Sequence, residues 1–67
     1  HIMQNVTIGA KDGYAPVIGN DVLIGAGAVI LGHVTLGDRC IVGANSVVIK
    51  NVDVDTVVAG APAKKIN

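Results

Sequence analysis

Aliphatic side chains recur along this chain at a spacing of six residues. Isoleucine, leucine or valine occupies six positions at this interval without a break: Ile18, Ile24, Ile30, Leu36, Val42 and Val48. On an α-helix six residues turn through about 600°, so these side chains would point at several faces and form no apolar stripe. In an extended chain side chains alternate between two sides, and residues six apart return to the same side. The spacing therefore excludes a helix and predicts short β-strands.

Small and turn-forming residues separate the predicted strands. A glycine follows the aliphatic residue in four of the six hexads, at Gly19, Gly25, Gly37 and Gly43. The fifth position of each hexad is small or β-branched: Val22, Ala28, Val34, Cys40, Ser46 and Val52. Three such hexads form one coil of a parallel β-solenoid, whose coils stack about 4.8 Å apart. The register predicts three stacks across neighbouring coils, namely Ile18 with Leu36 and Val54, Ile24 with Val42, and Ile30 with Val48.

Departures from the spacing suggest where the repeat is interrupted and where it ends. The pair Ile8-Gly9 lies ten residues before Ile18, which predicts an inserted loop of about four residues near 11–14. The pattern fades after residue 59, so we expect a repeat domain over 4–59 and a C-terminal tail over 60–67. The opening residues 1–3, His-Ile-Met, look like a purification-tag remnant and are set aside.

Composition narrows the possible classes of protein. The 67 residues contain five Lys or Arg and five Asp or Glu side chains, one cysteine, one tyrosine, no phenylalanine and no tryptophan. A neutral chain with a single tyrosine does not fit a nucleic-acid binder, and one cysteine excludes an internal disulfide. No apolar run approaches the length that a membrane span needs. A single domain of this size needs additional stabilisation, so we expect association between copies of the chain.

Three segments carry a resemblance to a known family. They are residues 4–9 (QNVTIG), residues 24–28 (IGAGA) and residues 59–64 (AGAPAK). With the hexad pattern, they make the chain similar to the hexapeptide-repeat acyltransferases, most of all to the C-terminal part of the serine acetyltransferases. The resemblance implies a left-handed parallel β-helix of about three coils, assembled as a cytoplasmic homotrimer.

The resemblance also implies an activity, with alternatives. The function implied is O-acetyl transfer from acetyl-CoA to a small hydroxyl acceptor, with L-serine as the preferred candidate. A sugar or antibiotic acetyltransferase of the same fold is one alternative, and a cropped or engineered β-helix that only trimerises is another. The acceptor pocket is expected outside this chain, so the sequence does not identify the acceptor.

Five residues match positions that bind CoA in the family. By the resemblance, backbone groups of Ala26 and Ala44 line the pantetheine arm, and Lys64 meets the phosphates. Ile49 and Lys50 match a Thr-Lys pair of the family, although Ile49 lacks the hydroxyl. The alternatives are tight turns for the two alanines and solvated surface charges for the lysines.

No residue of the chain is predicted to be a catalytic base. By the resemblance, the base is a histidine upstream of Gln4, and a second family histidine is replaced here by Ala15. His33 occupies a turn position and is expected to be solvated, and Cys40 is expected to be buried filler. No histidine or cysteine spacing suits a metal, so no metal is expected.

Overall fold

The computed structural model describes all 67 residues and contains nine short strands and no helix. The strands are β1 (Thr7–Gly9), β2 (Val17–Ile18), β3 (Leu23–Ile24), β4 (Val29–Leu31), β5 (Thr35–Leu36), β6 (Ile41–Val42), β7 (Val47–Val48), β8 (Val57–Ala59) and β9 (Lys64–Lys65). They form three sheets with the orders β1-β4-β7, β2-β5 and β3-β6-β8-β9. All pairings are parallel except that of β8 with β9, as expected for successive turns of one coil.

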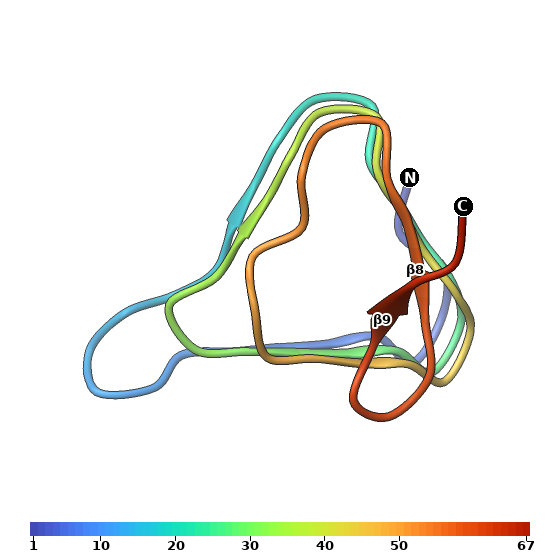
Figure 1. Cartoon of the computed structure of the whole chain (residues 1–67). Coiled ribbons are helices and arrows are strands. Elements are labelled where there is room, and N and C mark those ends of the chain that lie inside the picture. Colours follow the sequence, from blue (N-terminus) through green and yellow to red (C-terminus); the bar gives the residue numbers. More distant parts are fainter.

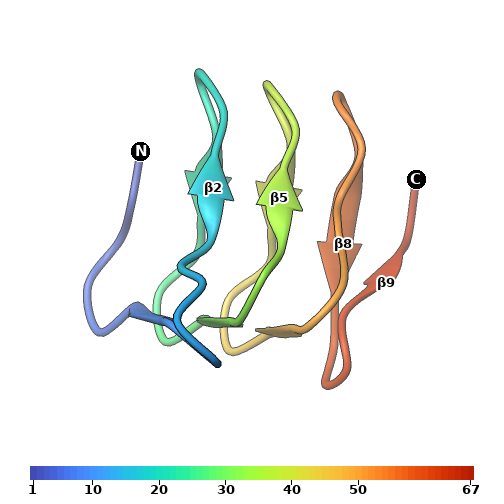
Figure 2. The ribbon, with the colours of Figure 1, turned by 90° about the vertical axis from the view of Figure 1, so that its left-hand side faces the viewer.

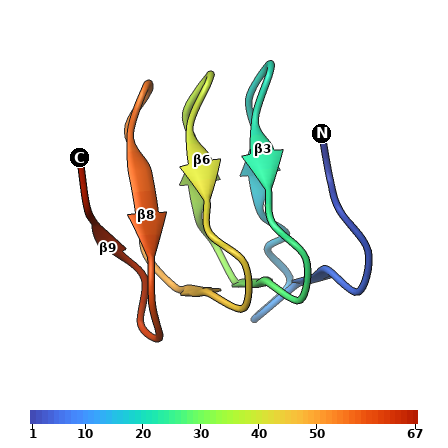
Figure 3. The ribbon, with the colours of Figure 1, turned by 90° about the vertical axis from the view of Figure 1, so that its right-hand side faces the viewer.

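The three sheets are the faces of a triangular prism. Viewed along its axis, the chain follows the same triangle on each turn (Figure 1). The successive turns stand beside one another when the prism is viewed from the side (Figure 2 and Figure 3). The chain runs clockwise around the triangle in Figure 1 while it advances toward the viewer, so the coil is left-handed. We call the sheets the first face (β1-β4-β7), the second face (β2-β5) and the third face (β3-β6-β8-β9).

The periodic aliphatic side chains fill the inside of the prism. The fully buried large side chains are Ile24, Ile30, Leu36, Val42 and Val48. The small positions of the hexads are buried between them, at Val22, Ala28, Val34, Cys40 and Ser46. Three predicted pairs are confirmed, because the register aligns Ile18 with Leu36, Ile24 with Val42, and Ile30 with Val48. Full burial of one such aliphatic side chain is worth about 1.5–3 kcal/mol.

The predicted stacking of Val54 over Leu36 is wrong. Leu36 pairs with Val52, whose exposure is 7%, whereas Val54 is 55% exposed. The last coil has two residues fewer than a regular coil, because Leu36 and Val52 are 16 residues apart, whereas Ile18 and Leu36 are 18 apart. Val52 therefore occupies the inward position that a large aliphatic residue holds in the other coils, and not the small fifth position of a hexad. The small buried residue of this coil is Thr56.

Both irregular coils change length at the same edge, the one between the first and second faces. In the first coil Ile8 pairs with Ile30, 22 residues later, and the extra residues form a loop in which Lys11 and Tyr14 pair as an antiparallel bridge. In the last coil the shortening falls between Val48 and Val52. We call this edge, formed by residues 10–16, 31–34 and 49–51, the variable edge. The loop projects from it in Figure 1.

The edge between the second and third faces carries a column of charged residues. Asp21, Arg39 and Asp55 occupy it in successive coils, all in the left-handed backbone region with φ of 57°, 60° and 55°. Aspartate tolerates this conformation better than most residues, and arginine does so less readily. The Arg39 guanidinium donates two hydrogen bonds to the Asp55 carboxylate, Nε to Oδ1 at 2.7 Å and Nη2 to Oδ2 at 3.2 Å. The pair connects two coils on the surface of the prism.

Both chain ends join the third face. At the start, Ile2 forms a parallel bridge with Ile24, so the residues set aside in the sequence lie beside the first complete coil. At the end, β9 returns antiparallel to β8, with Ala59 opposite Lys64 (Figure 3). The segment expected as a tail thus contributes a strand to the prism. No helix in the structure is long and apolar enough to cross a membrane.

Candidate functional site

The edge between the third and first faces is built from small residues that allow neighbouring coils to approach closely. It comprises residues 25–28, 43–46 and 59–63, and we call it the small-residue edge. A Cβ atom on Gly25 would lie 2.6 Å from the backbone nitrogen of Ala44. Gly27, two residues later, has φ of +75°, which side chains rarely adopt. The glycines are therefore required by coil stacking and by the turn.

Ala26 and Ala44 lie one above the other on this edge. The carbonyl of Ala26 accepts a hydrogen bond of 2.9 Å from the backbone nitrogen of Asn45. The backbone N–H groups of Ala26 and Ala44 make no hydrogen bond within the chain. Ala44 is exposed and Ala26 is half-buried. The edge therefore has two unpaired backbone donors, one coil apart, with the Asn45 side chain close to Gly27 between them.

Lys64 follows the small-residue edge directly and lies in β9 of the third face. It pairs with Ala59 at the end of β8, where the chain turns toward the small-residue edge. Lys65, the next residue, lines a hollow at the end of the prism, so the alternation of side chains places Lys64 on the outer side of β9. Its side chain is exposed and makes no salt bridge. A free cation and two backbone donors suit a ligand with amide oxygens and phosphates.

Ile49 and Lys50 do not lie with the other three candidates. They follow β7 and belong to the variable edge, whereas Ala44 precedes β7. Ala44 lies in the turn before β7 and Ile49 follows the end of this strand, so the two residues lie at opposite ends of one side of the triangle. Both side chains are exposed. The five predicted residues are therefore divided between two edges of one chain.

His33 takes part in a contact that the sequence did not indicate. It is exposed on the variable edge, and its ring stacks on that of Tyr14 with centroids 4.5 Å apart and an interplanar angle of 15°. Tyr14 belongs to the inserted loop, so the stack connects the loop with the coil beside it. The pattern gave no signal for this pair, because the path of an inserted loop is not periodic.

Two buried polar groups have structural roles. Cys40 is fully buried, as expected for a filler, and burial raises the pKa of its thiol. Ser46 is also fully buried, and its Oγ accepts a hydrogen bond of 3.2 Å from the backbone nitrogen of Gly60. This bond holds the turn that leads into β9. No group of three or more His, Cys, Asp or Glu residues is arranged to hold a metal ion.

Comparisons with known proteins agree with the hexad pattern and the architecture. A family model described as bacterial transferase hexapeptide (six repeats) matches residues 15–50. A serine acetyltransferase from Buchnera aphidicola is 41% identical over 98% of this chain and 26% of its own length. A chloramphenicol acetyltransferase from Agrobacterium fabrum is 44% identical over 85% of this chain and 29% of its own length.

A solved structure of a serine acetyltransferase in complex with CoA also resembles the chain. It superposes with a TM-score of 0.91 at 43% identity, over 97% of this chain and 27% of the solved one. The chain thus spans about a quarter of the length of the proteins it matches. The family model covers more than half of the chain, and the matched residues include strands β2 to β7 of the prism. The chain belongs to the bacterial transferase hexapeptide family.

Proposed function

We propose that the protein containing this chain transfers the acetyl group of acetyl-CoA to the hydroxyl group of L-serine. Similarity to a serine acetyltransferase over 98% of the chain carries the proposal. The resemblance to a serine acetyltransferase solved with CoA supports the choice of donor. The small-residue edge supplies suitable contacts, because Ala26 and Ala44 present free N–H groups and Lys64 a free cation.

The proposed reaction is direct acyl transfer. The acceptor oxygen attacks the thioester carbonyl, a C–O bond forms, the C–S bond breaks, and CoA leaves as the thiol. A base whose pKa is near neutrality takes the hydroxyl proton and delivers it to the sulfur. We propose that this base lies outside residues 4–67, since His33 is stacked on Tyr14 at the variable edge. In this proposal the described residues bind and orient the donor, and none of them moves a proton.

We also propose that the protein is a cytoplasmic homotrimer whose donor sites lie between neighbouring prisms. Outward side chains of the third face support a lateral contact, because Leu23 and Ile41 are aligned and each is 38% exposed. Val57 continues this apolar row in the next coil. A trimer would place the small-residue edge of one chain near another edge of its neighbour. Such a contact would allow Ile49 and Lys50 of a second chain to complete a site.

A different acceptor is the second candidate, and one observation favours it. The chain is 44% identical to a chloramphenicol acetyltransferase over 85% of its length. A sugar or antibiotic acceptor is therefore compatible with the same donor edge. The third candidate is a β-helix that only trimerises. It would have the same fold as the two enzymes but would turn over no substrate.

An acceptor screen tests these candidates. The full protein is mixed with acetyl-CoA and with serine, chloramphenicol or a galactoside, and thiol release is followed with Ellman's reagent. Serine-dependent release supports the proposal. Release with chloramphenicol or the sugar alone would establish the second candidate, and no release with any acceptor would favour the third.

A calorimetric titration with CoA tests the donor edge separately. Lys64→Ala should weaken binding by about tenfold, the effect of losing one charge-assisted contact to phosphate. Lys11→Ala is the matched control, because it removes the same charge from the inserted loop. Equal affinities of the two variants would remove Lys64 from the site. Lys50→Ala should weaken binding only if a second chain contributes its variable edge.

A further inference from the structure

The inserted loop contains the one position in the chain where glycine follows an aspartate or asparagine, at Asp12-Gly13. These two residues form the tip of a hairpin turn, with φ of 53° at Asp12 and 82° at Gly13. Positive φ at both tip residues is typical of a type I′ turn, for which Asp-Gly is a preferred pair. Lys11 and Tyr14 close the turn with two backbone hydrogen bonds, of 2.9 and 3.0 Å. The pair is therefore explained as a turn, and its chemistry is a separate property.

The two groups that can react with each other at this tip are both without a partner. The Asp12 carboxylate forms no salt bridge and no hydrogen bond, and the backbone nitrogen of Gly13 donates none. No atom lies within 4 Å of the position that a Cβ atom on Gly13 would occupy. A glycine nitrogen is also the amide that can approach the preceding side chain most easily, because no Cβ lies beside it.

The other aspartates and asparagines lack this combination. None of them precedes a glycine, so a side chain on the next residue hinders the approach of its nitrogen. The Asp38 carboxylate also accepts a hydrogen bond of 2.8 Å from the Asn20 nitrogen. Asn45 precedes Ser46, whose nitrogen donates to the Gly43 carbonyl at 3.3 Å. Asp12 is thus set apart both by its sequence neighbour and by its surroundings.

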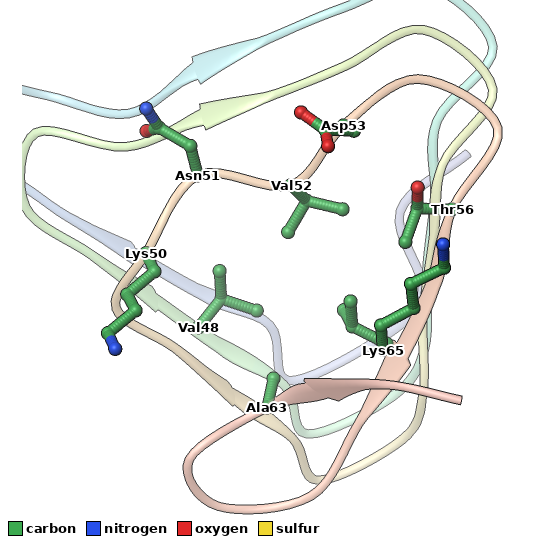
Figure 4. A pocket seen from close by; sticks show the side chains of 9 residues that line it. Val48, Lys50, Asn51, Val52, Asp53, Thr56, Ala63 and Lys65 are labelled. Carbon is green, nitrogen blue, oxygen red and sulfur yellow. The ribbon is translucent and has the colours of Figure 1, made fainter. Parts of the chain in front are cut away.

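The inserted loop is held less firmly than the corner that the last coil forms at the same edge. That corner is tied to the coil before it, because Oδ1 of Asn51 accepts a hydrogen bond of 2.9 Å from the Thr35 nitrogen (Figure 4 shows the Asn51 side chain). No side chain in residues 10–16 makes a hydrogen bond. The turn can therefore open without disturbing the coils, and the stack of Tyr14 on His33 opposes this opening.

We propose that Asp12 is a site of spontaneous isoaspartate formation and that the stack of Tyr14 on His33 controls its rate. When the turn opens, the Gly13 nitrogen attacks Cγ of the neutral Asp12 carboxyl. A C–N bond forms, and the carboxyl hydroxyl leaves with the amide proton as water. Water then adds to the resulting succinimide. Cleavage between the Gly13 nitrogen and the main-chain carbonyl carbon of Asp12 gives isoaspartate, whereas cleavage at Cγ returns aspartate.

The product changes the path of the backbone. In isoaspartate the main chain runs through Cβ and Cγ, so the tip of the turn contains one additional atom and the α-carboxylate is free. A two-residue turn closed by bonds of 2.9 and 3.0 Å cannot keep this pairing with a longer tip. Conversion should therefore release the Tyr14 ring from His33. The inference is independent of acetyl transfer, because the reaction needs only the loop and water.

The test incubates the folded 67-residue chain at neutral pH and physiological temperature, beside a blocked peptide of residues 10–16. Isoaspartate is counted by enzymatic carboxyl methylation and located by mass spectrometry. The folded chain should form it at Asp12 about threefold to tenfold more slowly than the peptide, because two hydrogen bonds and a ring pair must open first. Absence of product while the peptide converts would overturn the proposal. A rate equal to that of the peptide would show that the turn exerts no control and would overturn it as well.

Variants test the stack and the assignment separately. His33→Ala should raise the rate by about twofold to threefold, as for loss of an exposed ring pair that keeps the turn closed. His33→Phe keeps a flat ring and should retain the original rate, and equal rates in all three proteins would overturn the role of the stack. Asp12→Glu cannot close a five-membered ring and should form no product at the tip; isoaspartate formed equally well in this variant would place the reaction elsewhere. Tyr14 emission should match that of His33→Ala after conversion, and unchanged emission would contradict release of the ring.

Discussion

The ring of His33 lies nearly parallel to that of Tyr14, with centroids 4.5 Å apart, and joins the inserted loop to the coil beside it. Such a ring pair is worth about 0.5–1.5 kcal/mol, and less where water reaches it, as it does here. The loop has only one other internal connection, the two backbone hydrogen bonds between Lys11 and Tyr14. The stack is therefore one of the contacts that position the loop over the variable edge, where Lys11 also lies close to Gly32.

Replacing the imidazole tests this role. We expect His33→Ala to speed hydrogen exchange of the Lys11 and Tyr14 amides while lowering global stability by no more than about 0.5 kcal/mol. Tyr14 is the only aromatic residue of the three fluorescent types, so its emission reports the stack directly. His33→Phe, which keeps a flat ring, should retain slow exchange. Unchanged exchange in His33→Ala would mean that the hairpin bonds alone hold the loop.

The shortened last coil makes a prediction about two valines. Val52→Ala removes a buried side chain over Leu36 and should lower the free energy of unfolding by about 2 kcal/mol, from lost burial and the cavity. Val54→Ala removes the same atoms from an exposed position and should change it by less than about 0.5 kcal/mol. Urea unfolding curves measure both. A larger loss of stability in Val54→Ala than in Val52→Ala would mean that Val54 stacks on Leu36, as an uninterrupted spacing of six predicts.

The ion pair between Arg39 and Asp55 makes stability depend on pH. The Arg39 guanidinium lowers the pKa of the Asp55 carboxyl, chiefly through its hydrogen bond. A carboxyl whose pKa is lower in the folded state contributes stability above its unfolded pKa of about 3.9, and this contribution is lost as the pH falls through the folded value.

Arg39→Gln should therefore return the pKa of Asp55 toward its usual range. The free energy of unfolding of this variant should then fall less steeply as the pH is lowered. The pKa is measured by carbon NMR of the carboxyl, and the profile by thermal unfolding between about pH 5 and pH 2. High salt should reduce the difference between the proteins, because both side chains are exposed. Asp53→Asn is the control, because it removes a nearby carboxylate that forms no ion pair with Arg39.

The buried thiol gives a fourth prediction. Burial raises the pKa of Cys40, and its side chain is not accessible to solvent. Thiolate is the reactive form, so both effects protect the residue. Ellman's reagent should not react with the folded chain, and it should release one equivalent per chain in denaturant, since Cys40 is the only cysteine. Rapid reaction under native conditions would mean that the prism opens locally at this coil.

The regular part of the fold could be predicted because each coil repeats the same inward positions. Ile24 and Val42 are a whole coil apart in the sequence, and periodicity alone places them together. The last coil could not be predicted in the same way. Val52 and Val54 are both valines, so either register presents an aliphatic side chain to Leu36, and only the length of the corner decides between them.

The candidate site was predictable in part for a similar reason. Ala26 and Ala44 lie in two regular coils, so their common edge follows from the repeat. The position of Lys64 depends on β9, which reverses direction, and no spacing rule describes that return.

The variable edge also bears on how this architecture can change. The three coils cross it with segments of different length, while the other two edges keep the same number of residues in every complete coil. An insertion at this edge lies outside the prism and leaves the buried stacks in register, as the loop before Val17 does. A foreign loop placed between Gly32 and Val34 should therefore be tolerated, whereas the same loop at Gly25 would separate coils that touch. Evolution and protein engineering can thus add new surface chemistry at one edge without rebuilding the interior.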